Sequence, residues 1–255
     1  MVKMKARLTK PEAGNKYYIR KVNGGYNPCI KGEPTDKDCN VLANCTGYST
    51  GRFNEIGEYN ECKYLGNTNA ENYTNYCKTQ GLELGQIPKE GSCMVWHGKG
   101  SKAGHVAIVE KVISGIEVLT SESGYGSKKI FWTQHRNKGN GNWGQNKNYT
   151  FKGFIYNPAV EDYWTKGTYK TLVSKYIRTS PKVATNNYVL VKECMASVKP
   201  KLTSQKPNDK AKYKKNVIVD IKNFVYDSKG NLWGLTKNTY FCVKDSTGNQ
   251  VEKIK

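Results

Sequence analysis

Hydrophobic positions follow two different periods along the chain. Between residues 45 and 58, the larger side chains recur three and four positions apart, as Phe53 and Ile56 do. This spacing predicts a helix that begins at Cys45. Residues 69–81 have the same spacing and predict a second helix.

The stretch from His105 onward alternates instead with a period of two. Val106 and Ile108 fall on one face and His105 on the other, as expected for a half-buried strand. A turn at Ser114 and Gly115 separates this run from a second β-branched run. The pattern therefore predicts a β-hairpin.

The pattern changes again after a predicted linker at residues 159–167. From there on, short alternating stretches are separated by turn residues, with little helical period. We expect an α+β domain over residues 1–158 and a small all-β barrel over residues 168–255. The strands predicted in the second domain cover residues 169–173, 188–192, 217–225, 232–235 and 239–243.

Candidate chemistry lies at the start of the first helix and in the hairpin. At a helix start, free backbone N–H groups and the helix dipole favour a cysteine thiolate, so Cys45 is a candidate nucleophile. Among the three histidines, His105 opens the hairpin, and Glu122 falls on the same face of it. A lone cysteine is most often a buried apolar residue, so the hypothesis requires Cys45, His105 and Glu122 to meet as nucleophile, base and orienting acid.

These motifs resemble the CHAP family of cysteine, histidine-dependent amidohydrolases and peptidases, which includes many bacteriophage endolysins. The resemblance lies in Asn-Cys-x-Gly-Tyr at residues 44–48, in Gly-His-Val-Ala-Ile-Val-Glu at residues 104–110, and in Ser-Glu-Ser at residues 121–123. It covers residues 16–158 and implies a papain-like fold and cleavage of an amide bond in peptidoglycan. Many members place an asparagine two residues after the glutamate, where this chain has Gly124.

The second domain resembles the bacterial SH3 (SH3b) domains that target hydrolases to cell walls. The similar segments are residues 176–181 (Tyr-Ile-Arg-Thr-Ser-Pro) and residues 230–236 (Gly-Asn-Leu-Trp-Gly-Leu-Thr). The resemblance implies a wall-binding barrel in which Trp233 is expected to pack in the core.

The charge of the chain adds a preference for anionic partners. The formal net charge is +20, and residues 165–255 hold 19 basic and 6 acidic residues. Such a surface is attracted to polyanions, of which the anionic polymers of a Gram-positive wall are one class and nucleic acid is another. Because there is no RRM-like aromatic motif and no basic helix, we expect no nucleic-acid partner.

No cofactor, metal or membrane partner is expected from the sequence. Asp36, Asp38 and Asn40 have the spacing of the start of a calcium loop, but no acidic residue follows at its far end, which favours an Asp-rich turn. The cysteines lack a Cys-x-x-Cys pair, and Cys29 with Cys39 is the pair to watch for a disulfide. The chain has no apolar run of membrane-spanning length and no signal-peptide pattern at its start. We therefore expect synthesis in a host cytoplasm and action on the cell wall.

Three other interpretations remain open at the level of sequence. The chain fits a non-catalytic protein that binds walls or polyanions, a nucleic-acid binder, or a papain-like protease that acts on proteins. The peptidoglycan amide that is cut, the second oxyanion donor and the oligomeric state are not encoded in any motif.

Overall fold

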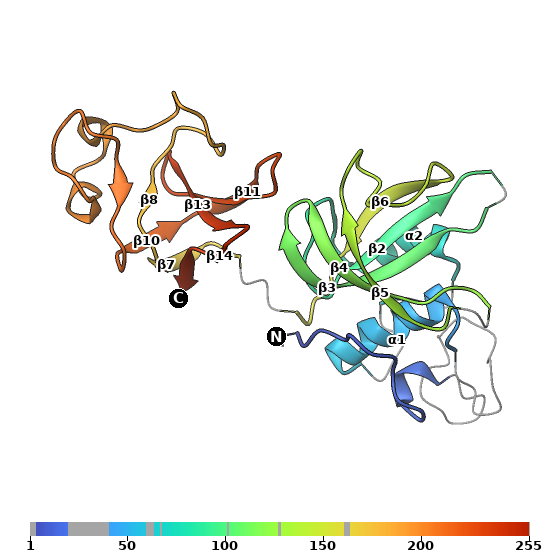
Figure 1. Cartoon of the computed structure of the whole chain (residues 1–255). Helices are drawn as coiled ribbons and strands as arrows, with labels where there is room; N and C mark the ends of the chain where they lie inside the picture. Colours follow the sequence, from blue (N-terminus) through green and yellow to red (C-terminus); the bar gives the residue numbers. More distant parts are fainter. Residues whose placement is uncertain are drawn as a thin grey trace. The chain divides into compact units, whose positions relative to one another are not determined.

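The computed structural model describes residues 4–19, 41–59, 64–66, 68–100, 102–126, 129–160 and 164–254. The chain forms two compact units (Figure 1). Unit 1 comprises Met1–Ile113 and Glu117–Glu161, and unit 2 comprises Ser114–Ile116 and Asp162–Lys255. Strands outnumber helices in the described part of both units, and unit 1 combines them as an α+β fold.

Unit 1 is built on a six-stranded sheet in the order β1-β6-β2-β3-β4-β5. The pairs β1–β6, β2–β6, β2–β3 and β4–β5 are antiparallel. Strands β3 and β4 have a paired neighbour on each edge, and side chains along each strand project alternately to the two faces of the sheet. The strands are β1 (Leu84–Gly85), β2 (Cys93–Gly98), β3 (His105–Ser114), β4 (Glu117–Glu122), β5 (Trp132–Asn137) and β6 (Tyr149–Ile155).

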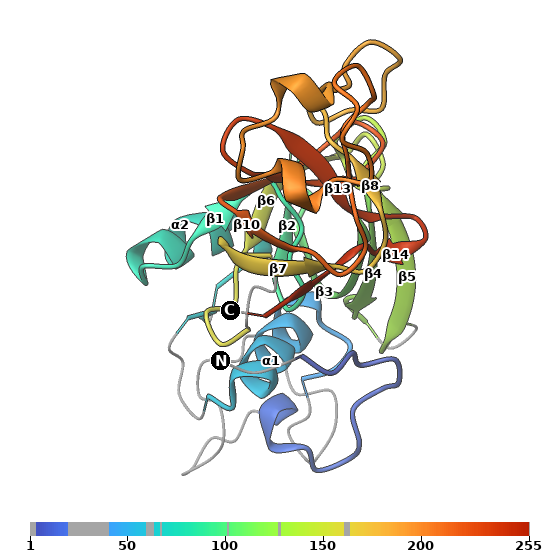
Figure 2. The ribbon, with the colours of Figure 1, turned by 90° about the vertical axis from the view of Figure 1, so that its left-hand side faces the viewer.

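The helices of unit 1 include the one predicted to begin at Cys45. Helix α1 spans Cys45–Gly57 and lies beside the sheet (Figure 2). It begins there because the Asn44 side chain caps it, accepting hydrogen bonds from the N–H groups of Thr46 and Gly47. The predicted second helix is shorter than expected: a 3₁₀ turn, η2 (Ala70–Asn72), leads into α2 (Tyr73–Thr79).

Gly51 permits a close contact between α1 and the first 3₁₀ turn, η1 (Lys16–Tyr18). A Cβ atom at this position would lie 2.6 Å from the Tyr17 carbonyl oxygen and 2.7 Å from the Tyr18 ring. Tyr18 itself is buried and stacks on Tyr48 of α1. The low helix propensity of glycine is thus offset by packing that no larger residue allows.

The sheet of unit 1 has an apolar cluster on each face. Val106 and Ile108 pack with Phe53 and Ile56 of α1 on one face. Ala107 and Val109 pack on the other face, with the residues Met94, Trp96, Val112, Val118, Trp143 and Phe154. The alternation predicted for β3 is therefore confirmed.

The hairpin turn lies one residue later than predicted. Strand β3 runs through Ser114 and β4 begins at Glu117, so the turn residues are Gly115 and Ile116. Moving a two-residue loop by one position changes the strand pairing by two residues, and this leaves every side chain on the same face. His105 and Glu122 consequently stay on one face, although the predicted turn was wrong.

A buried ion pair attaches helix α1 to the sheet. The Arg52 guanidinium donates from Nε and Nη2 to the two carboxylate oxygens of Glu110 on β3, both at 2.9 Å. Ser121 on β4 donates to Glu110 at 2.6 Å, and Tyr48 on α1 donates to Ser121 at 2.7 Å. The network joins the element that carries Cys45 to the strands that carry His105 and Glu122.

Unit 2 is all-β in its regular structure apart from two short 3₁₀ turns. Its described strands form three sheets, β10-β7-β15, β11-β12-β13-β14 and β8-β9, and they do not close into one barrel. The strands are β7 (Gly167–Thr171), β8 (Lys175–Tyr176), β9 (Lys212–Tyr213), β10 (Ile218–Ile221), β11 (Asn223–Tyr226), β12 (Leu232–Leu235), β13 (Tyr240–Asp245), β14 (Gly248–Asn249) and β15 (Val251–Lys253); the turns are η3 (Val191–Glu193) and η4 (Lys199–Lys201).

Some strand predictions for unit 2 hold and others do not. The strand at residues 232–235 is confirmed, whereas residues 217–225 form parts of two strands that are separated at Lys222. Residues 188–192 form isolated bridges and part of η3, and this prediction was wrong. Trp233 is buried as expected, and its indole N–H donates to Asp227.

Several cysteine and metal predictions fall partly outside the described residues. Asp36, Asp38, Asn40 and the pair Cys29–Cys39 lie in the part of the chain that the structure does not describe. Where residues are described, Cys45, Cys77, Cys93, Cys194 and Cys242 are free thiols. Within the same residues, no three His, Cys, Asp or Glu side chains gather as a metal site, and no helix has the length and apolar character to cross a membrane.

Glu110→Gln tests the attachment of α1. The amide keeps the shape of the carboxylate but removes the fully buried anion beside Arg52, which then keeps only its ion pair with the partly buried Glu55, so we expect the free energy of unfolding to fall by about 2 kcal/mol. Urea denaturation followed by tryptophan fluorescence measures the change. The matched control is Glu117→Gln on β4, which removes the partner of the exposed His135 and should cost less than about 1 kcal/mol. Equal losses in the two variants would contradict the role of Glu110.

Candidate active site

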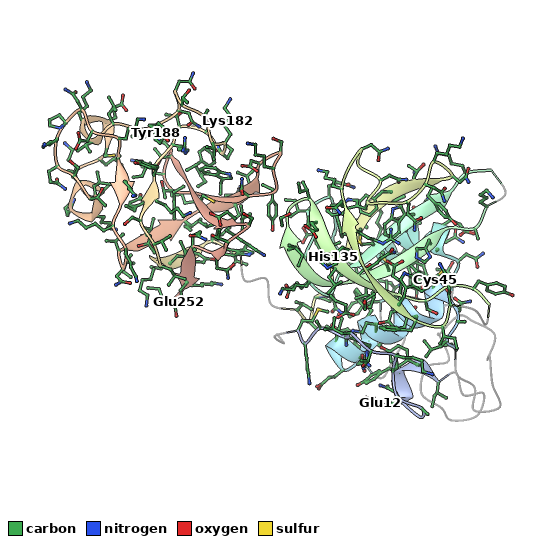
Figure 3. The ribbon with its side chains drawn as sticks, viewed as in Figure 1. Glu12, Cys45, His135, Lys182, Tyr188 and Glu252 are labelled. Carbon is green, nitrogen blue, oxygen red and sulfur yellow. The ribbon has the colours of Figure 1, made fainter. Side chains whose placement is uncertain are left out.

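A cleft of about 1150 Å³ in unit 1 is lined by two of the three predicted site residues, and the third, Glu122, is buried behind it. Cys45 and His105 both line it, together with Asn44, Trp132 and Gln134. Cys45 lies at the start of α1 next to the sheet (Figure 3). The residues predicted as nucleophile and base thus share one solvent-accessible space.

The three predicted site residues meet at the His105 ring. His105 Nε2 lies 2.8 Å from Glu122 Oε2, and Cys45 is close enough to the ring to contribute to the raised pKa of His105. Because Glu122 occupies Nε2, the Nδ1 atom is the nitrogen left for the sulfur. This is the order of contacts that a thiol nucleophile, a base and an orienting acid require.

Two tryptophans fix the plane of the His105 ring. The Trp132 ring is parallel to it, with centroids 6.3 Å apart and an interplanar angle of 6°. Trp96, which pairs with His105 across β2 and β3, lies 5.9 Å away at 30°. The imidazole is therefore restrained by packing as well as by its hydrogen bonds.

Glu122 is held by a set of donors that the sequence did not reveal. Arg136 donates from Nε to Oε1 at 2.6 Å and from Nη2 to Oε2 at 2.7 Å. Gln134 and Thr120 also donate to Oε1, at 2.8 and 2.5 Å. These donors alternate along β4 and β5 on the face that carries Glu122, because side chains two apart share a face.

The pKa values of His105 and Glu122 are shifted in opposite directions. Burial by itself would lower the pKa of His105, but its hydrogen bonds with Cys45 and Glu122 raise the pKa to about 9. Burial would raise the pKa of Glu122, yet hydrogen bonds from His105 and Arg136 hold it well below its ordinary value. The pair is therefore an imidazolium and a carboxylate at neutral pH.

The first turn of α1 leaves one backbone donor at the sulfur. The Thr46 and Gly47 N–H groups are occupied by the Asn44 side chain, and the Tyr48 N–H is bonded to the Asn44 carbonyl. Across the described residues, no partner is found for the Cys45 N–H. This donor is free to face an oxygen that develops negative charge next to Cys45.

The remaining histidines and the family's asparagine position do not contribute a side chain to the chain of contacts. His135 lies on β5 and bonds to Glu117 at 2.7 Å in an exposed position. His97 is not among the residues that line the cleft. Gly124 lines the cleft without a side chain.

Comparison with known proteins extends these observations. Residues 35–124 match the CHAP domain. The CHAP match includes Cys45, His105 and Glu122, and it ends before β5 begins at Trp132. Arg136 and Gln134 thus lie outside the matched region. The only signal for them in the sequence is the alternation of Trp132, Gln134 and Arg136.

Solved structures give a weaker likeness. "The crystal structure of Ly7917" is 16% identical, covers 89% of this chain and 94% of that chain, and has a TM-score of 0.34. "The crystal structure of Ly7917 with the hydrolyzing product of MDP" is 17% identical, covers 83% and 89%, and has a TM-score of 0.33. No curated protein matches the sequence.

The ring titration of His105 tests the ion pair with Glu122. A raised folded-state pKa means that the pair stabilises the fold fully below about pH 6.5, the ordinary value, and that this stability is lost as the pH rises through about 9. In Glu122→Gln the anion is absent, so we expect the titration midpoint of the His105 ring to fall by about 1 pH unit or more.

Ring-nitrogen NMR of ¹⁵N-histidine-labelled protein measures both midpoints. His135→Gln removes the signal of the exposed histidine and so assists assignment. A wild-type midpoint at or below the ordinary histidine value would contradict the ion pair.

Proposed function

We propose that the protein is a cysteine-dependent hydrolase that cleaves an amide bond of peptidoglycan, either as an N-acetylmuramoyl-L-alanine amidase or as an endopeptidase. The observation that carries the proposal is that Cys45 and His105 line one open cleft and that the buried Glu122 is hydrogen-bonded to His105 from behind. The CHAP match over residues 35–124 supports the same class of chemistry.

The proposed reaction is acyl transfer through a thioester. The Cys45 sulfur attacks the amide carbonyl carbon, and the Cys45 N–H donates to the oxyanion that forms. The imidazolium of His105 gives its proton to the leaving amine, and the C–N bond breaks. His105 then takes a proton from water, the hydroxide oxygen attacks the thioester, and the carboxylic acid product leaves with Cys45 regenerated.

The cleft is open and polar, which fits a polymer substrate. Glu71 lines it on one side, and Lys102 and Lys129 line it elsewhere. Tyr125, also a lining residue, is 88% exposed. Peptidoglycan stems carry both amines and carboxylates, so charged groups of both signs in the cleft are suited to them.

Unit 2 is proposed to bind the wall. Its net positive charge favours anionic wall polymers, and the segments at residues 176–181 and 230–236 support an SH3b-like assignment. In this proposal the protein is of the endolysin type, is made in a host cytoplasm and acts on the wall once it has access to it.

Cys45→Ala tests the nucleophile. The variant lacks the attacking sulfur, so clearing of purified Gram-positive walls should be abolished while co-sedimentation with those walls stays unchanged. Cys242→Ala, which removes a partly exposed thiol of unit 2, is the matched control and should clear walls like the wild type. Clearing by Cys45→Ala would show that the assignment is wrong, and clearing by neither variant nor wild type would favour a non-catalytic wall binder. Mass spectrometry of the released fragments identifies the amide that is cut.

Arg136→Met tests the support of Glu122. Without the guanidinium, the carboxylate loses two of its donors and no longer holds His105 in one orientation, so kcat should fall by about tenfold or more with KM little changed. Arg136→Lys retains the charge but not the paired donors, and it should recover part of kcat. Initial rates of wall solubilisation measure both. A change in KM alone would place Arg136 in substrate binding instead.

A further inference from the structure

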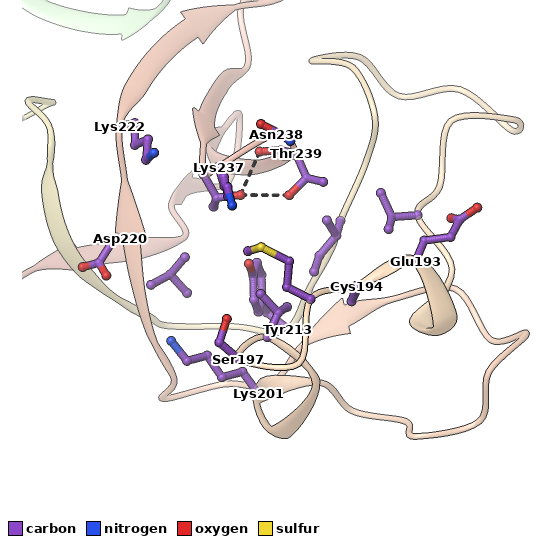
Figure 4. A pocket seen from close by; sticks show the side chains of 16 residues that line it. Glu193, Cys194, Ser197, Lys201, Tyr213, Asp220, Lys222, Lys237, Asn238 and Thr239 are labelled. Atoms are coloured by element: carbon purple, nitrogen blue, oxygen red, sulfur yellow. Dashed lines mark hydrogen bonds between the residues drawn. The ribbon is translucent and has the colours of Figure 1, made fainter.

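Unit 2 contains a cavity of about 330 Å³ that is separate from the cleft of Cys45 (Figure 4). It lies between η3–η4, strand β10 and the turn that joins β12 to β13. Four of its lining residues, Ile177, Val189, Tyr213 and Val219, belong to the buried apolar core of the unit. The cavity therefore exposes apolar side chains of the core. Water that fills the cavity stays in contact with this apolar surface, which a ligand could cover.

Three of the hydroxyl groups that line the cavity, those of Thr236, Thr239 and Tyr213, interact with one another. Thr236 and Thr239 share a hydrogen bond of 2.8 Å between their Oγ1 atoms, and Tyr213 bonds to the Thr236 side chain. Burial raises the pKa of Tyr213 to about 12, so its hydroxyl is neutral at physiological pH. The wall supplies polar but uncharged contacts next to the apolar floor.

The acidic side chains of the lining are engaged elsewhere. Asp220 accepts a hydrogen bond from Thr168 at 2.8 Å, and Glu193 accepts one from the Leu190 N–H at 2.7 Å. In Figure 4 both carboxylates lie at the outer edges and point away from the centre. They contribute little negative charge to the interior of the cavity.

Two lysines of the lining, within the described part of the chain, have ammonium groups that are available to a ligand. Lys201 donates to the Ile218 carbonyl, but the ammonium groups of Lys222 and Lys237 have no side-chain hydrogen bond or ion pair within the part of the chain that the structure describes. Figure 4 shows the Lys237 ammonium pointing into the cavity. Residues 165–255 as a whole carry 19 basic and 6 acidic residues, which reinforces the local positive potential.

We propose that this cavity binds the free carboxylate end of a short peptide with small apolar side chains. The carboxylate pairs with Lys237, and methyl-sized side chains cover Val219 and Val189 on the floor. The volume is at the lower end of the range for small-molecule sites and suits two or three small residues. A polyol phosphate would satisfy the lysines but would leave the apolar floor without a complement.

Titration of the ¹⁵N-labelled full chain with N-acetyl-alanyl-alanine tests the proposal by NMR. We expect saturable shifts at the amides of residues 236–239 and 219–222, and at least about tenfold weaker binding of the same peptide as its C-terminal amide. The D,D and L,L peptides distinguish the source of the ligand: preference for D,D assigns a wall peptide, and preference for L,L assigns a protein C-terminus. Cys45 takes no part in this measurement, so its outcome is independent of the proposed catalysis.

Two variants at exposed positions test the cationic part of the site, at Lys237, and its apolar part, at Met195. Lys237→Met should weaken binding by about tenfold or more, whereas Lys229→Met, which removes the same charge at the far end of β11 and β12, should not change it. Met195→Glu places a negative charge at a lining residue that is 44% exposed and should abolish binding.

Three results would overturn the proposal. The first is the absence of saturable shifts at about 10 mM peptide. The second is equal affinity for the carboxylate and the amide. The third is that glycerol phosphate shifts these amides while the acetylated dipeptide does not, because the cavity would then recognise phosphate.

Discussion

The buried ion pair between Arg52 and Glu110 is the constraint on which the geometry of the candidate site depends. Cys45 sits at the end of a helix, and a helix can slide or rotate on a sheet unless something specific fixes it. The paired donors of Arg52 fix α1 against β3, and the Tyr48–Ser121 contact fixes it against β4. Apolar packing alone is non-directional and would not set the position of the sulfur to hydrogen-bond accuracy.

Strand β4 both fixes helix α1 and orients the His105 ring. Ser121 points to the face of α1 and bonds to Glu110, whereas Glu122 points to the opposite face and bonds to His105. Period-two alternation makes this possible, because neighbouring residues on a strand project to opposite faces. The same hairpin therefore positions the helix and orients the imidazole.

The cost of burying a carboxylate explains the surroundings of Glu122. An isolated buried charge is expensive, so Glu122 must have several donors to stay ionised. Arg136, Gln134 and Thr120 supply them, and Arg136 also donates to the Trp143 carbonyl. Although Arg136 also lines the cleft, its paired contacts with Glu122 make it a positioning residue in the proposed chemistry, acting through Glu122 and His105.

The sequence by itself determined the start of α1, the alternation of β3 and the candidates Cys45, His105 and Glu122, because each depends on residues close together in the chain. Only the tertiary structure decided the meeting of those three residues, the ion pair of Arg52 with Glu110, the contact of Arg136 with Glu122 and the arrangement of unit 2 into three sheets. Strand β5 was missed because its inward face is polar, with Gln134 and Arg136 in place of apolar residues, so it lacks the hydrophobic period that predicts a strand. Contacts of this kind join residues that are distant in the chain, and a local pattern carries no information about such partners.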